Sequence, residues 1–400
     1  MRTILTVTEE YWPEPGGGNL ATHLIVDILS QLDDIRVVVV SGAENPARIT
    51  AVKHVSTPLL RASNKIELWT KLTLLTRCGW FQRMLDSADT VYIPRFCYPL
   101  VPLANKRGKK VVVHLHNYQP ISYNAAALCN SHKSNGLEAI KHAARHELME
   151  HESPARAVLS GLLTMMAKLS RLWISGADKI ICVSHRQCEI VSSYAPEVAR
   201  KMEVIYNPLP EASTTEKQPG KPTIMYLGGD SYLKGFHVFL RASYELLENG
   251  FDTKFMLTRV FKDTNRLLIK RLNNRFDEAY SLLTCPKHEQ LLDVLSRSWA
   301  LMFPSLWEEP LPYAVIEAML SGTIPVASNV GGIPEIVGGT FAEKMLFEPG
   351  NIQQCADRLA SLLAMSEDQV VDVGLSLRET VLRKFESEAV RTKLLQAFSD

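Results

Sequence analysis

The chain has 400 residues, of which 46% are hydrophobic and 22% are charged, the balance of a soluble globular protein. This length is too great for one ordinary hydrophobic core and suits two domains of roughly 200 residues each. Lys and Arg number 44 against 43 Asp and Glu, which leaves a net charge of +1. That balance gives no indication of a nucleic-acid partner.

Several features predict a cytoplasmic protein. No segment has the roughly 20 apolar residues that span a bilayer, and Met1 to Thr8 resembles a strand more than a signal peptide. The cysteines are odd in number and form no C-x-x-C pair, which favours reduced thiols. Residues 146–151 superficially match a zinc motif, but histidines five apart on a helix diverge by about 140°. We therefore expect no metal site.

Short β-branched runs alternate with amphipathic helical stretches along nearly the whole chain. Runs such as Val37 to Val40 do not alternate with polar residues, which indicates strands buried on both faces of a parallel sheet. The sequence predicts an α/β protein with two facing Rossmann-like, doubly wound sheets. The expected strands are residues 3–8, 36–40, 90–93, 110–115, 179–183 and 203–205, then 223–227, 253–257, 300–303 and 324–327.

A Pro-rich, polar stretch over residues 207–222 predicts a linker. We expect an N-terminal, acceptor-binding domain over residues 1–206 and a donor-binding domain over 223–384. A final helix near residues 386–398, within a terminal segment 385–400, is expected to pack back on the first domain. Ligands of such sheets bind beyond the carboxyl ends of the strands, so the predicted site is an interdomain cleft.

Two glutamates eight positions apart stand out in the second half. A predicted strand ends at Phe303 and a helix starts near Pro312, which puts Glu309 in a loop and Glu317 in the helix. Carboxylates so placed can engage two sets of ligand hydroxyls, and the N–H groups between them favour a phosphate. Taken alone, the pair is better explained by Glu309 as a partner of the helix dipole and Glu317 as a solvated surface charge.

The surrounding sequence resembles glycosyltransferase family 4, a retaining family with the GT-B fold. Residues 304–326 are close to the family pattern PSxxExxGxxxxEAxxxGxPV, and the resemblance continues into Gly331 to Glu335. The resemblance implies that Glu309 contacts the donor sugar and Glu317 the ribose. Residues in the donor-binding stretch between them are Leu311, Pro312 and Tyr313. The usual glycine is Pro312 here, which removes one N–H donor.

A second glycine loop follows the first strand of this half. Gly228 and Gly229 allow a ligand close to the backbone, and Lys234 offers a compact cation for a diphosphate. A turn followed by a helix lysine explains the same residues. The resemblance implies pyrophosphate binding, but Gly229 replaces the family's arginine, so Arg259 is the candidate for the missing charge.

The first half carries weaker signals. Gly16-x-Gly18-x-x-Ala21 formally matches a dinucleotide fingerprint, but it follows its strand too late and no carboxylate ends the next strand. A glycine loop in which Gly17 and Gly18 face the donor phosphates fits better, as in the family. Ser184 also matches the family pattern, although a turn role explains it.

Two histidines end a buried strand of the first half. Alternation places His114 and His116 on the same side of the sheet. A packed, hydrogen-bonded histidine is the usual explanation for such a position. The resemblance implies that one reaches the donor sugar, and we favour His116 over His114.

The resemblance implies metal-independent, retaining transfer of a hexose from a UDP- or GDP-sugar to a hydroxyl of a glycan or lipid-linked acceptor. Such chemistry serves polysaccharide or glycolipid synthesis and needs no further cofactor. The expected catalytic residues are His116, Lys234 and Glu309. The alternatives are a non-catalytic sugar-nucleotide-binding protein and an NAD-dependent oxidoreductase, which the absent ribose carboxylate disfavours.

Residues 48–83 are strongly basic and contain Trp69, Trp80 and Phe81. Such a segment can dock on an anionic membrane that carries a lipid-linked acceptor. A solvated helix whose aromatic side chains face the core is an equally good interpretation. The stretch from Ile140 to Ser175 is a candidate lid or second interfacial helix.

Overall fold

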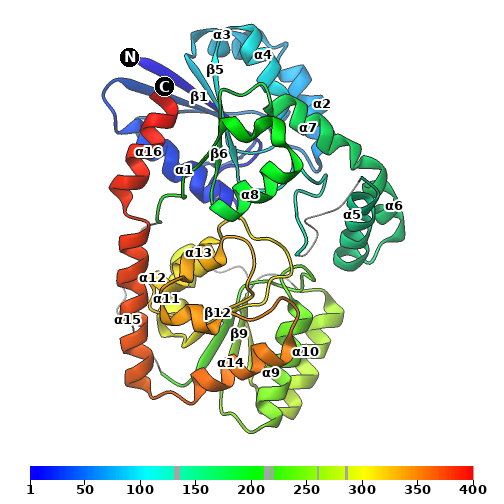
Figure 1. Cartoon of the computed structure of the whole chain (residues 1–400), viewed down its shortest axis with the longest axis vertical. Coiled ribbons are helices and arrows are strands. Elements are labelled where there is room, and N and C mark those ends of the chain that lie inside the picture. Colours follow the sequence, from blue (N-terminus) through cyan, green and yellow to red (C-terminus); the bar gives the residue numbers. More distant parts are fainter. Residues whose placement is uncertain (130–135, 211–216, 218–219, 259–260, 284–286, 400) are drawn as a thin grey trace.

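The computed structural model describes residues 1–129, 136–210, 217, 220–258, 261–283 and 287–399. Its strands form two parallel sheets, one in each half of the chain (Figure 1). The first sheet has the order β3-β2-β1-β4-β5-β6-β7 and the second the order β10-β9-β8-β11-β12. Both are doubly wound, and the predicted fold class is confirmed.

The strands have the following bounds: β1 Arg2–Thr8, β2 Ile35–Ser41, β3 Lys53–Ser56, β4 Thr90–Ile93, β5 Lys110–Leu115, β6 Lys179–Cys182, β7 Met202–Val204, β8 Thr223–Tyr226, β9 Lys254–Thr258, β10 Tyr280–Leu283, β11 Ala300–Phe303 and β12 Ile324–Ala327. Central strands are buried on both faces, as β4 and β11 show along their whole length. That burial explains why their sequences are continuous apolar runs.

The helices have the following bounds: α1 Gly17–Ser30, α2 Lys65–Leu75, α3 Gly79–Ser87, α4 Val101–Lys106, α5 Gly136–His151, α6 Pro154–Leu163, α7 Met165–Ile174, α8 His185–Tyr194, α9 Phe236–Glu248, α10 Asp263–Arg275, α11 His288–Arg297, α12 Tyr313–Leu320, α13 Ile333–Val337, α14 Ile352–Leu363, α15 Glu367–Lys384 and α16 Ser387–Ser399. Single 3₁₀ turns occupy Pro58–Leu60, Tyr98–Leu100, Pro196–Lys201 and Phe341–Met345.

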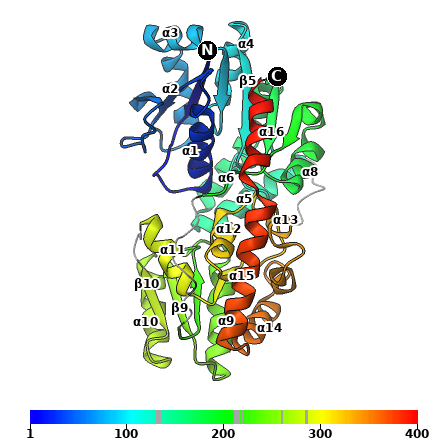
Figure 2. The same ribbon diagram turned by 90° about the vertical axis from the view of Figure 1, so that its left-hand side faces the viewer.

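The last two helices connect the halves. Helix α15 runs along the second half, and α16 continues onto the first (Figure 2). Val390, Leu394 and Phe398 of α16 pack in one buried cluster with Ile4 of the first sheet. The chain therefore ends on the domain where it begins, with Arg2 donating a 3.2 Å hydrogen bond to the Ser399 carbonyl.

The aromatic side chains of residues 48–83 are largely part of the core. Trp69 and Phe81 are buried, and the Trp69 ring stands edge-on to Trp173 at 4.8 Å. Trp69 Nε1 donates a 3.0 Å hydrogen bond to the Phe96 carbonyl. For these two rings the structure agrees with the interpretation in which the aromatic side chains face the core.

Among the described residues, no single helix is long and apolar enough to cross a membrane. The helical segments Pro154–Gly161 and Met166–Ile174 satisfy the test of length and composition only together, and they are bent by 45° at the break between them.

Candidate active site

The carboxyl ends of the two sheets face each other, and loops from both halves touch between them. The Glu308 N–H donates a 2.8 Å hydrogen bond to the Ala127 carbonyl, and Leu128 forms an isolated bridge with Trp307. The Tyr313 hydroxyl donates a 2.7 Å hydrogen bond to the Pro208 carbonyl at the start of the linker. The motif of the second half thus lies at the junction with the first.

Lys234 and Glu309 come together at the carboxyl end of the second sheet. Lys234 Nζ lies 2.6 Å from Glu309 Oε1, which also accepts a 2.8 Å hydrogen bond from the Ser305 hydroxyl. The ammonium stands 5.2 Å from the centre of the Trp307 ring, within cation–π range. Glu309 is only 4% exposed. The expected cation, Lys234, and the expected sugar-binding carboxylate, Glu309, therefore form an ion pair that is partly shielded from water.

Glu317 has a partner that the sequence did not suggest. It is 5% exposed, and its Oε1 lies 2.8 Å from Nε2 of His288, the first residue of α11. The hydrogen bond to Glu317 raises the pKa of His288. The His288 ring stands edge-on to Trp12 of the first half at 5.3 Å. The expected ribose carboxylate is therefore buried and linked through His288 to the other domain.

The paired glycines after β12 hold the Glu309 loop in shape. The Gly331 N–H donates 2.7 Å to Glu308 Oε2, and the Gly332 N–H donates 2.8 Å to the Glu309 carbonyl. Gly331 has a φ of +54°, and a Cβ there would lie 1.9 Å from the Glu309 carbonyl oxygen. Only glycine fits this contact.

The glycine loop after β8 also requires its small residues. A Cβ on Gly228 would lie 2.1 Å from the Tyr226 hydroxyl, and Gly229 has a φ of +61°. Asp230 is engaged elsewhere, since its Oδ2 accepts a 2.6 Å hydrogen bond from the Lys262 N–H. Arg259, the candidate for the missing cation, lies outside the described residues.

The N-terminus of α1 enters the junction from the first half. A Cβ on Gly17 would lie 3.3 Å from the Tyr313 ring, and one on Gly18 would lie 3.2 Å from His116 Cβ. Helix α1 thus directs its free backbone N–H groups toward the loops of the second half. A helix N-terminus in this position favours an anion.

Two histidines lie at the end of β5 and in the loop after it; His114 is buried and His116 is half-buried. Their rings lie 4.1 Å apart, and His114 Nδ1 lies 2.9 Å from the Tyr92 hydroxyl. Burial, with a contribution from Arg95, lowers the pKa of His116 to about 3. Among the described residues, His116 Nε2 is buried without a hydrogen-bond partner. His116 can therefore offer a hydrogen bond to a ligand but cannot carry a charge at neutral pH.

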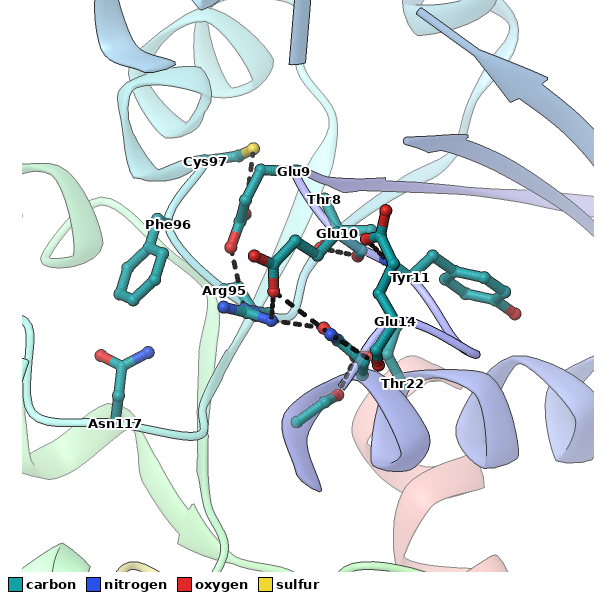
Figure 3. A network of polar contacts seen from close by, with 12 residues as sticks. Thr8, Glu9, Glu10, Tyr11, Glu14, Thr22, Arg95, Phe96, Cys97 and Asn117 are labelled. Carbon is teal, nitrogen blue, oxygen red and sulfur yellow. Dashed lines mark hydrogen bonds and ion pairs between the residues drawn. The ribbon is translucent and has the colours of Figure 1, made fainter. Parts of the chain in front are cut away.

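Arg95 organises the loops above β1 and β4 (Figure 3). Its Nε lies 2.8 Å from Glu9 Oε1 and its Nη1 2.6 Å from Glu10 Oε2, and it also contacts Asn19. Burial raises the pKa of Glu9, although Arg95 opposes that shift. Beside this network opens a cavity of about 500 Å³, lined by residues that include Glu10, Glu14, Glu44 and Arg61.

A glutamate of the second half binds the start of a helix in the first. Glu335 of α13 accepts hydrogen bonds of 2.9 and 2.8 Å from the N–H groups of His185 and Arg186, and one of 3.1 Å from the Tyr206 hydroxyl. Ser184 caps the same helix, α8, by accepting a hydrogen bond from the Gln187 N–H. A Cβ on Gly332 would lie 3.1 Å from Ser184 and 3.2 Å from Leu311, so these predicted residues meet at the junction.

Comparison with known proteins decides the family. The family described as glycosyl transferases group 1 matches residues 211–371. Over these residues the chain belongs to this family. This glycosyltransferase is 22% identical over 421 aligned residues to the α-maltose-1-phosphate synthase of Mycolicibacterium smegmatis, covering 99% of this chain and 98% of that protein.

Solved structures share the GT-B fold of this glycosyltransferase. Anabaena HepE in complex with UDP and glucose aligns over the whole of both chains with 17% identity and a TM-score of 0.68. The sucrose-phosphate synthase of Thermosynechococcus elongatus aligns over 100% of this chain and 98% of its own with 14% identity and a TM-score of 0.74. The family match and these relatives identify the chain as a glycosyltransferase.

Sequence reasoning missed His288, Glu335 and Arg95. His288 and Glu335 act across elements far apart in the chain, and only Glu335 stood inside a quoted motif. Arg95 follows β4 at its carboxyl end, which was a usable signal for a cleft residue. No group of three or more candidate metal ligands occurs in the described part of the chain.

Proposed function

We propose that this glycosyltransferase transfers a hexose from a UDP- or GDP-sugar, with retention of configuration and without a metal, to a hydroxyl of a glycan or lipid-linked acceptor. The observation that carries the proposal is the pairing of Lys234 with Glu309, together with the buried Glu317 on the helix that follows, α12. A diphosphate leaving group needs a cation and N–H donors, and a sugar needs hydrogen-bonding carboxylates.

The donor diphosphate would lie between Lys234 and the N-terminus of α1. Lys234 would exchange its partner Glu309 for the phosphate, which frees Glu309 to accept hydrogen bonds from the sugar hydroxyls. Glu317 would hold the ribose in place of His288. Gly228, Gly229 and the stretch of Leu311, Pro312 and Tyr313 would line the donor, and neutral His116 would donate to the sugar.

The acceptor would enter from the first half. The cavity beside Glu10 and Glu14 adjoins the loop that leads to Gly17, and its carboxylates can accept hydrogen bonds from acceptor hydroxyls. The bound form of HepE supports a glucose-type donor, since that structural neighbour holds UDP-glucose. Polysaccharide synthesis is supported by similarity to the putative colanic acid biosynthesis glycosyltransferase WcaL of Escherichia coli, 24% identical over 62% of this chain and 59% of that protein.

A transfer assay tests the proposal. The protein is incubated with UDP-glucose or GDP-mannose, EDTA and a panel of glycan and lipid-linked acceptors, and released nucleoside diphosphate is measured. The anomeric configuration of the product is then read by NMR. We expect acceptor-dependent release with retained configuration. Binding of the donor with no transfer to any acceptor would favour a sugar-nucleotide-binding protein, and an inverted product would contradict the mechanism.

A further inference from the structure

Exposed apolar side chains are concentrated on one group of helices in the first half. Of fourteen exposed large apolar residues in the described part of the chain, eight lie on α2, α5, α6 and α7. They are Ile66, Leu74, Ile140, Leu148, Val158, Leu159, Leu169 and Leu172. Single exposed apolar residues are ordinary, but a concentration of this kind indicates an interaction surface.

Helices α6 and α7 carry cations and no carboxylates. No Asp or Glu occurs between Glu152 and Asp178, whereas Arg156, Lys168 and Arg171 lie in that interval. Arg156 and Lys168 are exposed, and so is Arg145 of α5. The faces of α6 and α7, which combine exposed leucines with cations and have no carboxylate, are complementary to an anionic, apolar partner.

The bend between α6 and α7 excludes a straight membrane-spanning helix. Helices α6 and α7 are together apolar enough to resemble a membrane segment, yet they bend by 45° between Gly161 and Met166. Figure 1 shows α5 and α6 at the side of the molecule, away from both sheets, with α7 leading back to the first half. Trp173 of α7 packs on Trp69, which sets α2 beside α7.

We propose that α6 and α7, with the neighbouring faces of α2 and α5, form a surface that binds an anionic lipid bilayer. Val158 and Leu172, each 67% exposed, would enter the interface while the exposed Arg145 and Lys168 contact lipid phosphates. A second copy of the chain is a poorer occupant, because a two-fold contact would face these cations against their own copies. The membrane surface thus lies on α5–α7 and the outer side of α2, and does not use the buried rings of residues 48–83.

This surface is connected to the donor loop. Glu150 of α5 accepts a 3.0 Å hydrogen bond from the N–H of Leu233, the neighbour of Lys234, and Glu152 lies 3.2 Å from Lys262. A bilayer bound to α5–α7 would bring a lipid-linked acceptor close to the cleft. That consequence rests on the proposed function, whereas bilayer binding itself does not.

Vesicle flotation tests the proposal with the full chain and no nucleotide. The probe is a vesicle of equal parts phosphatidylcholine and phosphatidylglycerol, with pure phosphatidylcholine for comparison. We expect binding to the anionic vesicles that weakens with salt. Replacing Val158, Leu159 and Leu172 together by Ser should weaken partitioning more than about tenfold. Arg145→Gln and Lys168→Gln should each weaken it about fivefold.

A matched control removes the same number of exposed apolar side chains from the second half: Leu267→Ser, Leu268→Ser and Leu375→Ser. This variant should float like the parent. Equal loss in both triple variants, or no flotation of the parent, would overturn the proposal. Self-association of the parent without vesicles, abolished by the first triple variant, would assign the surface to a second copy. Donor binding is measured separately, so its absence leaves the vesicle result standing.

Discussion

The two halves of the molecule build their sides of the cleft in different ways. In the second half, Ser305, Glu309 and Glu317 come from one short stretch, and the buried carboxylates already hold Lys234 and His288. In the first half, contacts come from loops far apart in the chain, as Glu9 and Arg95 are. A contiguous motif therefore supplies the second half's side of the cleft, whereas the first half's side is assembled from residues far apart in the sequence.

The two halves also differ in how the charged side chains at the cleft are paired. The second half pairs its cleft carboxylates with Lys234 and His288. The first half buries neutral histidines and an Arg95 that is compensated by Glu9 and Glu10. We infer that the second half is built to exchange partners for a charged diphosphate. The first half is built to hold a fixed polar surface for hydroxyls.

The largest expected effect comes from Lys234→Ala. Its loss removes the one described cation that pairs with Glu309, so the departing diphosphate loses its charge partner. We expect kcat/KM to fall about 100- to 1000-fold, the usual cost of one preorganised stabilising group. Steady-state kinetics with saturating acceptor measure it. Lys262→Ala, which removes an exposed lysine paired with Glu152, is the control and should retain activity within a few-fold.

Glu317→Ala should act on donor affinity more than on turnover. Hydrogen bonds to a charged group are worth about 1.5–3 kcal/mol, so the donor Kd should rise roughly 10- to 100-fold. Calorimetric titration with the nucleoside diphosphate measures this Kd. Glu289→Ala, which removes an exposed glutamate next to His288 in the chain, is the control. Unchanged affinity would separate Glu317 from the ribose and weaken the contrast between the halves.

Lowering the pH should reduce the folding stability of the protein through the neutral His116 of the first half. The pKa of His116 falls from 6.5 to about 3 on folding, so the unfolded chain binds a proton that the folded chain does not. Stability from this group is present above pH 6.5 and is lost as the pH falls toward 3. At pH 5 the loss should be about 2 kcal/mol.

Urea unfolding of the parent and of His116→Phe at pH 7 and pH 5 tests this expectation. The variant should lose less stability than the parent between the two pH values. His185→Gln, at an exposed position, should behave like the parent. The same pH sensitivity in His116→Phe and the parent would contradict the buried, neutral state.

The smallest expected effect concerns the contact between the halves. Glu335→Ala removes a carboxylate that caps α8 across the junction, which should cost about 1 kcal/mol of stability. It should also open the empty protein, visible as a larger radius of gyration in solution scattering. Glu379→Ala, an exposed glutamate on α15, is the control. An unchanged radius would mean that Glu335 stabilises α8 without holding the halves together.

Most of the fold could be predicted from the sequence because its central strands are continuous apolar runs. The missed strands are β3 and β10, the edges of their sheets, whose residues are partly exposed and carry no such run. Lys234, Glu309 and Glu317 stood in local motifs, so sequence could propose them. His288 could not be proposed, because its meeting with Glu317 and Trp12 depends on the packing of α11 and on domain placement.

Calorimetric titration of the parent protein with UDP, GDP, ADP, CMP and NAD tests the central claim most directly. The account predicts that one nucleoside diphosphate binds selectively. That binding should be lost or much weakened in Lys234→Ala and Glu317→Ala and kept in Lys262→Ala and Glu289→Ala. Binding of NAD alone, or equal binding of the diphosphate to all four variants, would contradict a donor site at the Lys234–Glu309–Glu317 cluster.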